Sequence, residues 1–206
     1  MVNNMGIIED RRSIRKYKKK VVNDKDIKKI LLAGMAAPSP KNRQPWKFIV
    51  LKESDKIQLF ADTMREAINK KILEKDFRQD IRMSLETIET IKSVSVLILV
   101  CYEYGTVIMH DDGVNWPIKA RDIEAVELQA IGAAVENMLL KAQELGIGSL
   151  WCADVLYAYE VLKEYSNMPV VSAVCLGYAD ETPACRKRRK FDDVCTICLL
   201  YTSRCV

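Results

Sequence analysis

Two short basic blocks are the part of this sequence best suited to binding an anion. One reads Arg11-Arg12-Ser13-Ile14-Arg15, and the other, near the opposite end, reads Arg186-Lys187-Arg188-Arg189-Lys190. A guanidinium presents a planar fork of donors that matches a phosphate, and a serine hydroxyl adds a small hydrogen-bonding group that permits close approach. Each block taken alone fits an exposed basic segment equally well. The residue types therefore predict a phosphate site only if the fold brings the two blocks together.

Nucleic acid is the other anion that such blocks could serve. RNA-binding surfaces interleave basic residues with aromatic ones or line a helix with them, whereas these blocks are compact and flank an apolar domain. The chain also has no Gly-x-Gly-x-x-Gly after a first strand and no Walker phosphate loop. We therefore expect no nucleic-acid partner, and we expect a cofactor phosphate to be held mainly by side chains.

The remaining reactive residues argue against two other classes of site. The only histidine is His110, which counts against a Ser-His-Asp or Cys-His hydrolase. Of the seven cysteines, Cys195 and Cys198 alone have the Cys-x-x-Cys spacing, and a structural zinc site needs four ligands. We expect reduced thiols and no metal site.

Composition indicates one globular domain. The chain has 206 residues, of which 49% are hydrophobic and 29% charged, as in ordinary soluble proteins. The longest strongly apolar stretch, 94–102, is far shorter than the roughly 18 residues of a membrane span. The N-terminus lacks the apolar region of a secretory signal. We expect a cytoplasmic protein without a membrane partner.

The elements that must position the basic blocks follow an irregular order of helix and strand, which predicts an α+β fold. The segment 38–45 contains three prolines and is expected to be an ordered loop. The continuous apolar run 94–102 is expected at the centre of the sheet. Helices are predicted over 24–37, 54–75, 77–92, 122–145 and 154–167, and strands over 46–51, 94–102, 147–152 and 169–178.

One helix carries a packing signal as well. Small residues lie within Ile131-Gly132-Ala133-Ala134, and Gly146 follows the end of the pattern. Small side chains allow close approach to another helix, either of the same chain or of a second subunit, and of these two we expect packing within the same chain.

Five segments in order resemble the FMN-dependent nitroreductase family. They read Arg-Arg-Ser-Ile-Arg, Ala-Pro-Ser-Pro-Lys-Asn-Arg-Gln-Pro-Trp, Gly-Ala-Ala-Val-Glu-Asn-Met-Leu-Leu, Leu-Gly-Ile-Gly-Ser-Leu-Trp and Leu-Gly-Tyr-Ala-Asp-Glu-Thr-Pro. The resemblance runs from Ile8 to Val194. It implies an intertwined homodimer with a mixed, mostly antiparallel sheet flanked by helices, and two FMN sites at the subunit interface.

The resemblance also sets the domain boundary. Residues 1–194 are expected to form one FMN-binding domain. The remaining residues, 195–206, are a tail of doubtful origin, because Cys-Leu-Leu-Tyr-Thr-Ser is what one reading frame of a common transposon-end sequencing adapter encodes. We hypothesise that roughly the last ten residues are assembly read-through.

The two basic blocks and the proline-rich loop match family positions that contact the flavin. The first block matches the motif that holds the phosphate, ribityl chain and pyrimidine side, and the loop matches one that reaches the flavin from the other subunit. The second block matches a phosphate-binding basic pair, for which a one-residue slip to Arg189 stays open. The implied residues are Arg11, Arg12, Ser13 and Arg15; Pro38, Ser39, Asn42 and Gln44; and Arg186 and Arg188.

A further stretch, Leu150 to Asp154, matches the family segment that passes the flavin ring. The implied cofactor contacts are Leu150, Trp151 and Ala153, and a backbone N–H at Ala153 or Asp154 is expected to meet flavin N5. For the side chain of Trp151 we expect a position in the core rather than stacking on the flavin.

The reaction that the resemblance implies is carried by the cofactor. NADH or NADPH would deliver a hydride to FMN, and a small acceptor such as a nitroaromatic or a quinone would then be reduced, in ping-pong turnover. No side chain is assigned a catalytic role, and Arg12 or Arg15 would supply positive charge near the pyrimidine edge. Two alternatives stay open: another reaction of the same superfamily, such as dehalogenation or dehydrogenation, and a non-enzymatic flavin- or RNA-binding module.

Overall fold

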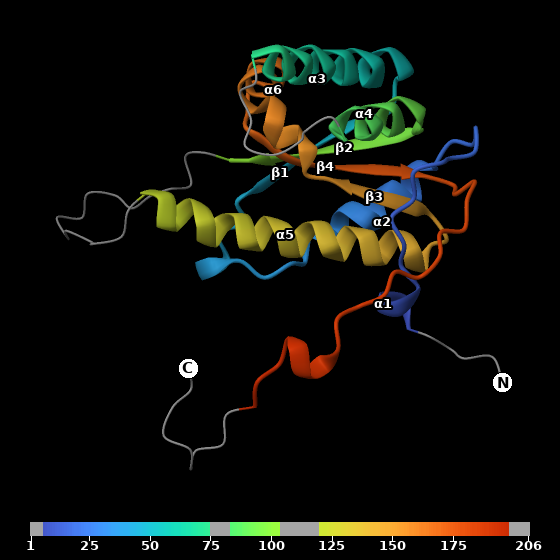
Figure 1. Cartoon of the computed structure of the whole chain (residues 1–206), viewed down its shortest axis with the longest axis vertical. Helices are drawn as coiled ribbons and strands as arrows, with labels where there is room; N and C mark the ends of the chain where they lie inside the picture. The colour runs from blue at the N-terminus through green and yellow to red at the C-terminus, as the bar shows by residue number, and fades with distance from the viewer. Residues whose placement is uncertain (1–5, 75–82, 104–119, 198–206) are drawn as a thin grey trace.

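A four-stranded sheet forms the middle layer of the molecule (Figure 1). The computed structural model describes residues 6–74, 83–103 and 120–197, and the side chains from Glu124 onward in the last range. The strands pair antiparallel in the order β1-β2-β4-β3. Their bounds are Trp46–Leu51 for β1, Val96–Tyr102 for β2, Gly148–Cys152 for β3 and Val170–Gly177 for β4.

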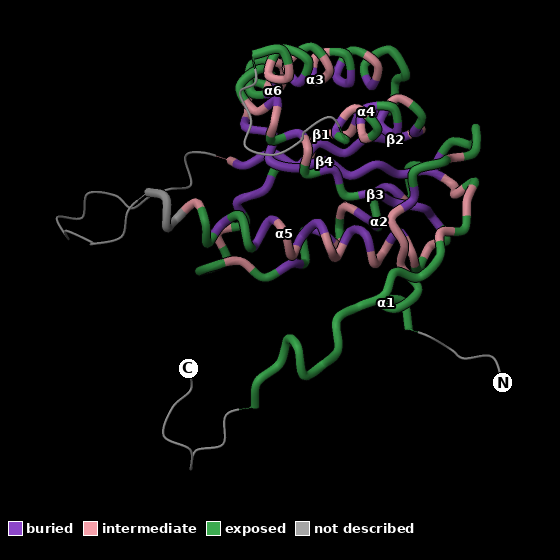
Figure 2. Tube along the Cα trace, viewed as in Figure 1, coloured by how far each residue is buried: buried purple, intermediate pink, exposed green. Residues whose placement is uncertain are grey.

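The two inner strands are the most apolar ones. Every residue of β2 and of β4 is buried, because helices cover both faces of the sheet there (Figure 2). The prediction that the apolar run 94–102 lies inside the sheet is confirmed. Side chains of β2 alternate between two hydrophobic clusters, with Leu97 and Leu99 in one and Ile98 and Val100 in the other.

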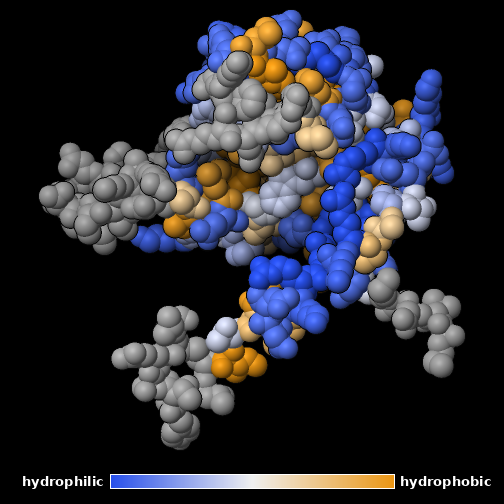
Figure 3. All heavy atoms as spheres, viewed as in Figure 1, coloured by the Kyte–Doolittle hydropathy of each residue, from blue (hydrophilic) through white to orange (hydrophobic). Residues whose placement is uncertain are grey.

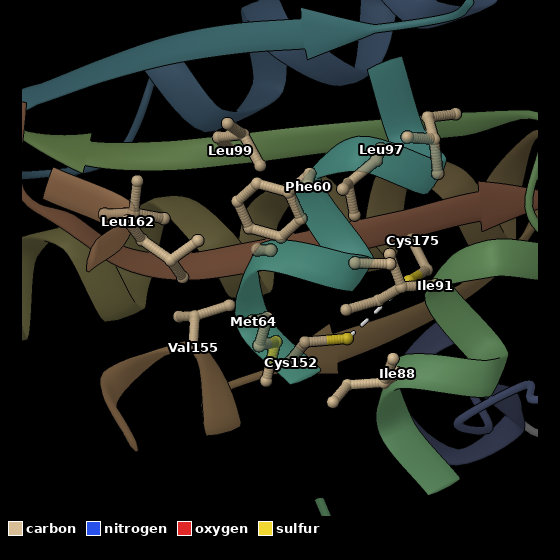
Figure 4. Close-up of a cluster of buried hydrophobic side chains, with 14 of the residues drawn as sticks. Phe60, Met64, Ile88, Ile91, Leu97, Leu99, Cys152, Val155, Leu162 and Cys175 are labelled. Carbon is tan, nitrogen blue, oxygen red and sulfur yellow. Dashed lines mark hydrogen bonds between the residues drawn. The ribbon is translucent and has the colours of Figure 1, made fainter. Parts of the chain in front are cut away.

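One face of the sheet is covered by three helices and a 3-10 turn. Figure 4 shows Phe60 and Met64 packed between Leu99 on one side and the thiol of Cys152 on the other. The sulfur atoms of Cys152 and Cys175 lie 3.6 Å apart in this cluster. The covering elements are α3 (Ser54–Glu74), α4 (Ser84–Ser93), η2 (Asp154–Ala158) and α6 (Tyr159–Ser166).

The opposite face is covered by α2 (Asp24–Met35) and α5 (Ala120–Glu144). The Asn23 side chain caps α2 by accepting a hydrogen bond from the backbone N–H of Asp26 at 3.0 Å. The two helices approach closely at Gly34, where an added Cβ would lie 2.8 Å from Cγ of Met138. The predicted internal packing of the small-residue helix is confirmed. Gly146, with φ of +68°, follows its end.

The N-terminal segment runs along the outer side of β3. After the short helix α1 (Ile7–Asp10), a parallel bridge joins Ser13 to Ser149, and the backbone N–H of Ile14 donates to the Ser149 carbonyl at 2.9 Å. The four strands are thus antiparallel, and this bridge supplies the parallel pairing expected of a mixed sheet. At the other end, the chain beyond β4 is exposed from Ala184 onward and includes the turn η3 (Phe191–Asp193).

Several element boundaries differ from the predicted ones. The helix predicted over 24–37 ends at Met35, and the one predicted over 154–167 is divided between η2 and α6. The described part of the helix predicted over 77–92 begins at Ser84. Three segments lie outside the described ranges: residues 75–82, residues 104–119, and residues 198–206, which belong to the tail. No described helix combines the length and apolar composition needed to cross a membrane.

Candidate functional site

The two basic blocks, far apart in the sequence, line one cavity of about 590 Å³. The red segment beyond β4 passes beside α1 in Figure 1, and the surface in this region carries a hydrophilic strip in Figure 3. Five arginines face a single glutamate in the lining, so the cavity carries a positive field. The lining residues are Ile8, Glu9, Arg11, Arg12, Ser13, Arg15, Pro183, Ala184, Cys185, Arg186 and Arg188.

Hydrogen bonds between the segments bring the blocks together. The backbone N–H of Lys18 donates to the Tyr178 carbonyl at 2.8 Å, and that of Asp180 donates to the Lys16 carbonyl at 2.9 Å. The carboxylate of Glu181 then accepts from two backbone N–H groups, those of Arg15 and, at 3.0 Å, of Lys16. The chain leaving β4 is thereby fixed to the first block just before it reaches the second.

Tyr17 anchors the same segment on the sheet. Its hydroxyl donates to the Ile14 carbonyl at 2.7 Å, and burial raises the pKa of Tyr17 far above its usual range. The ring lies so close to β4 that a Cβ on Gly177 would be 2.7 Å from the Tyr17 ring. A glycine is therefore required at position 177 for this contact.

Two arginines of the first block are held by the protein itself. Nε of Arg11 lies 3.3 Å from a carboxylate oxygen of Glu136 on α5, and this nitrogen is buried without a hydrogen-bond acceptor among the described residues. The guanidinium of Arg12 donates to the Arg11 carbonyl at 2.8 Å and to the Glu9 carbonyl. These contacts fix both guanidinium groups at the cavity wall before any ligand binds.

The other arginines are more exposed. Nη1 of Arg15 lies 3.5 Å from the Ser13 carbonyl, and across the three described ranges neither Arg186 nor Arg188 has an ion-pair partner. Arg189 is not part of the cavity lining, since its guanidinium donates to the Asp193 carbonyl. Arg186 and Arg188 thus line the cavity and Arg189 does not, and the assignment of the phosphate-binding pair stays a prediction.

The proline-rich loop lies away from this cavity. The 3-10 turn η1 (Pro40–Asn42) packs near the N-terminal half of α5, whereas Arg11 contacts the middle of that helix. Within the loop, Oγ of Ser39 accepts from the Gln44 backbone N–H at 2.9 Å. Pro38, Asn42 and Gln44 are exposed. One chain therefore does not bring the loop to its own cavity, and its contact with a partner's flavin stays a prediction.

The segment from Leu150 onward divides between core and surface. Leu150 is buried, Ala153 is exposed, and the Asp154 carboxylate accepts a hydrogen bond from the Thr87 hydroxyl at 2.5 Å. The core position expected for Trp151 is wrong, because its side chain is 40% exposed. Strand β3 lies at the edge of the sheet, and Trp151 contacts α5 at Gly132, where the small residue leaves the indole partly open.

Three glutamates with structural partners were not predicted from the sequence. Glu181 accepts hydrogen bonds from the backbone of the N-terminal segment, and Glu136 pairs with Arg11. Glu127 is buried and forms an ion pair with Arg43, with Oε1 and Nη2 3.0 Å apart. A signal exists for Glu127, which lies four residues before Ile131 and so on the apolar face of α5.

A family model described as the nitroreductase family matches residues 8–178. The chain belongs to the nitroreductase family. A relative from Archaeoglobus fulgidus, provisionally named an NADH dehydrogenase/NAD(P)H nitroreductase, is 33% identical over 182 residues, which cover 84% of each chain.

Solved structures of two family relatives agree with the fold. A BluB-like flavoprotein from Clostridium difficile superposes with a TM-score of 0.76 at 28% identity, covering 94% of this chain and 97% of that one. A provisionally named nitroreductase from Desulfovibrio desulfuricans, solved in complex with FMN, gives a TM-score of 0.67 at 26% identity and covers 96% and 95%. The predicted α+β fold, with a largely antiparallel sheet flanked by helices, is confirmed.

Proposed function

We propose that this chain is an FMN-dependent oxidoreductase that takes electrons from NADH or NADPH and passes them to a small acceptor such as a nitroaromatic or a quinone. The observation that carries the proposal is the cavity in which the two arginine blocks meet. It is supported by the family relationship and by the FMN complex of the Desulfovibrio desulfuricans relative.

The cavity suits the phosphate end of FMN. Its volume of about 590 Å³ lies within the roughly 300–1,000 Å³ of small-molecule sites. Arginine stays protonated at any physiological pH, so the five guanidinium groups hold permanent charge for a dianionic phosphate.

The ring of the cofactor is proposed to lie along Leu150, Trp151 and Ala153. The side chain of Asp154 is engaged by Thr87, so a contact to flavin N5 from this stretch has to come from the backbone of Ala153 or Asp154. When bound, FMN supplies two-electron chemistry, with donor and acceptor using the same space in turn. Arg12 and Arg15 place positive charge near the proposed pyrimidine edge, which stabilises negative charge that develops there.

The proposed assembly is a homodimer. Exposed apolar side chains occur on both helices that cover one face of the sheet: Leu32 and Met35 on α2, and Val126 and Leu128 on α5. A second copy would cover these side chains and receive the loop containing Ser39, Asn42 and Gln44 at its own flavin.

An absorbance experiment tests the function. The purified protein, reconstituted with FMN and freed of excess cofactor, should show a bound-flavin spectrum that NADH or NADPH bleaches anaerobically. A nitroaromatic or quinone added next should restore the colour. Protein that retains no FMN and instead binds RNA with a steep salt dependence would contradict the proposal. Flavin that stays oxidised with both nicotinamides would leave a flavin-binding module in place of an NAD(P)H oxidoreductase.

A further inference from the structure

A buried carboxylate lies outside the cavity and has no part in the chemistry proposed above. Glu127 on α5 is 1% exposed and shares the buried face of the helix with Ile131 and Met138. An ionised carboxylate in such a place is costly unless charged or hydrogen-bonding partners surround it. The partners of Glu127 therefore show which parts of the structure its carboxylate connects.

Those partners come from two other parts of the chain. Nη2 of Arg43, in the proline-rich loop, lies 3.0 Å from Oε1 of Glu127, and this arginine is only 20% exposed. The hydroxyl of Tyr102, at the end of β2, donates to Oε2 of Glu127. The carboxylate thus connects the loop to both the central sheet and the long helix.

The loop has a backbone that needs such an attachment. Lys41, Asn42 and Gln44 have φ values of 50°, 55° and 48°, in the left-handed region that non-glycine residues rarely adopt. Such a backbone is strained, and the conformation persists only where the surroundings fix it.

The loop's own hydrogen bonds do not provide the attachment. The Asn42 N–H donates to the Ser39 carbonyl at 3.0 Å, the Arg43 N–H donates to the Pro40 carbonyl at 3.0 Å, and the Gln44 N–H donates to Ser39 Oγ. All three bonds close within the loop, whereas the Glu103 N–H donates to the Pro45 carbonyl at 3.0 Å and the Arg43 side chain reaches Glu127, and these two contacts connect the loop to the body. The Arg43 side chain points inward to Glu127, whereas its neighbours Asn42 and Gln44 are exposed.

We infer that Arg43 and Glu127 are positioning residues for flavin binding. Their ion pair holds the loop 39–44 in the conformation that presents Asn42 and Gln44 to the flavin of the partner subunit. This inference rests on the proposed function, because it takes FMN to be the ligand that the loop reaches.

A coupling experiment tests the inference. FMN dissociation constants are measured by flavin fluorescence quenching for Gln44→Ala in the wild-type background and in the Glu127→Gln background. Glutamine keeps the size of Glu127 and can still accept from Tyr102, but it removes the charge that pairs with Arg43. We expect Gln44→Ala to weaken FMN binding roughly tenfold in the wild type and less than twofold in Glu127→Gln, where the loop is already displaced.

Ser13→Ala is the matched control. Ser13 lines the cavity on the N-terminal segment, which has no contact with this ion pair, so its penalty should be the same in both backgrounds. If Glu127→Gln does not fold, the double variant Arg43→Gln/Glu127→Gln replaces it, because it removes both charges of the pair and leaves no buried charge without a partner.

The outcomes separate the two proposals. Equal penalties for Gln44→Ala in both backgrounds, or no penalty in the wild type, would overturn the positioning role while leaving FMN binding in place. A wild-type protein that takes up no FMN would overturn the proposed function, and the positioning role with it.

Discussion

The cavity arginines differ in how firmly the protein holds them. Arg11 and Arg12 are fixed by Glu136 and by backbone carbonyls, whereas Arg186 and Arg188 are exposed. A held guanidinium loses little side-chain entropy when an anion binds, but an exposed one loses up to about 2 kcal/mol. The first block therefore forms a preformed wall of the cavity, and we expect the second block to lose more side-chain entropy when an anion binds.

The neighbouring arginines 188 and 189 offer a direct test of the cavity. We expect Arg188→Ala to weaken FMN binding about 10- to 100-fold, because a charge-assisted hydrogen bond contributes roughly 1.5–3 kcal/mol. Arg189→Ala removes the same charge one residue away, where the guanidinium contacts the Asp193 carbonyl and does not line the cavity. Its effect should be less than threefold. Similar losses for both variants in a fluorescence titration would show a diffuse charge effect and contradict the assignment.

The variant Arg15→Ala tests whether positive charge near the proposed flavin ring contributes to binding or reduction. Arg15→Ala should lower FMN affinity or slow the reduction of bound flavin by NAD(P)H, since a permanent positive charge is lost there. Stopped-flow absorbance at the flavin band measures the reduction step separately from binding. An unchanged affinity together with an unchanged reduction rate would remove Arg15 from the site.

At the scale of elements, the contact between α2 and α5 sets a limit on side-chain size. A Cβ on Gly34 would meet Cγ of Met138 at 2.8 Å and the Ala134 carbonyl at 3.4 Å. We expect Gly34→Val to lower the free energy of unfolding by about 2–3 kcal/mol, because neither atom is the free end of a flexible chain. Urea unfolding followed by circular dichroism measures this loss.

Gly132→Ala is the control for that prediction. A Cβ there meets only Trp151, at an ordinary 3.6 Å. Alanine in a helix is favoured over glycine by roughly 0.5–1 kcal/mol, so this variant should be as stable as the wild type or more so. Comparable losses at both glycines would mean that helix contact at Gly34 is not what limits side-chain size.

Elements whose pattern is local were predictable from the sequence. The capped helix starting at Asp24, the strand from Trp46 and the fully buried strand β2 depend on spacing within a few residues, and the structure contains all three. Trp151 was misassigned because burial of an edge-strand residue depends on which helix covers it. Helical periodicity could have indicated that Glu127 is buried, but the partners of Glu127 and Glu181 lie far along the chain, and periodicity does not reveal them.

The same limit applies to the site. Residue types in the two basic blocks indicated phosphate chemistry, and the resemblance to a family chose among the possible ligands. The sequence by itself left open whether the blocks meet, since their meeting depends on the pairing of Lys16 and Lys18 with the chain beyond β4.

At the scale of the whole molecule, buried thiols and a buried phenol predict how stability changes with pH. Burial raises the pKa of Cys101 from 9.0 to about 11, and the pKa values of Cys175 and Tyr17 are also raised, the former by its hydrogen bond with Cys152 and by burial. The unfolded chain therefore releases these protons first as pH rises. Stability is fully present below about pH 9 and is lost progressively above it.

The urea midpoint at pH 7.5 and at pH 10.5, with a reductant present, checks this dependence. We expect a lower midpoint at the higher pH. Cys101 should contribute about 2 kcal/mol to the loss in the free energy of unfolding between the two pH values. Cys101→Val removes one titrating group, so the pH-dependent loss in the free energy of unfolding should be smaller by that amount. A midpoint that stays constant or rises between the two pH values would contradict the prediction.

The N-terminal segment has a consequence for solubility as well as for binding. It runs beside β3 with Ile14 buried at 7% exposure, and its backbone satisfies hydrogen-bonding groups that an outer strand otherwise leaves free. Unprotected strand edges recruit strands from other molecules and start aggregation. A truncated protein that begins after Tyr17 would therefore lose six cavity residues and also expose a strand edge to other molecules, so that precipitation would accompany the loss of ligand binding.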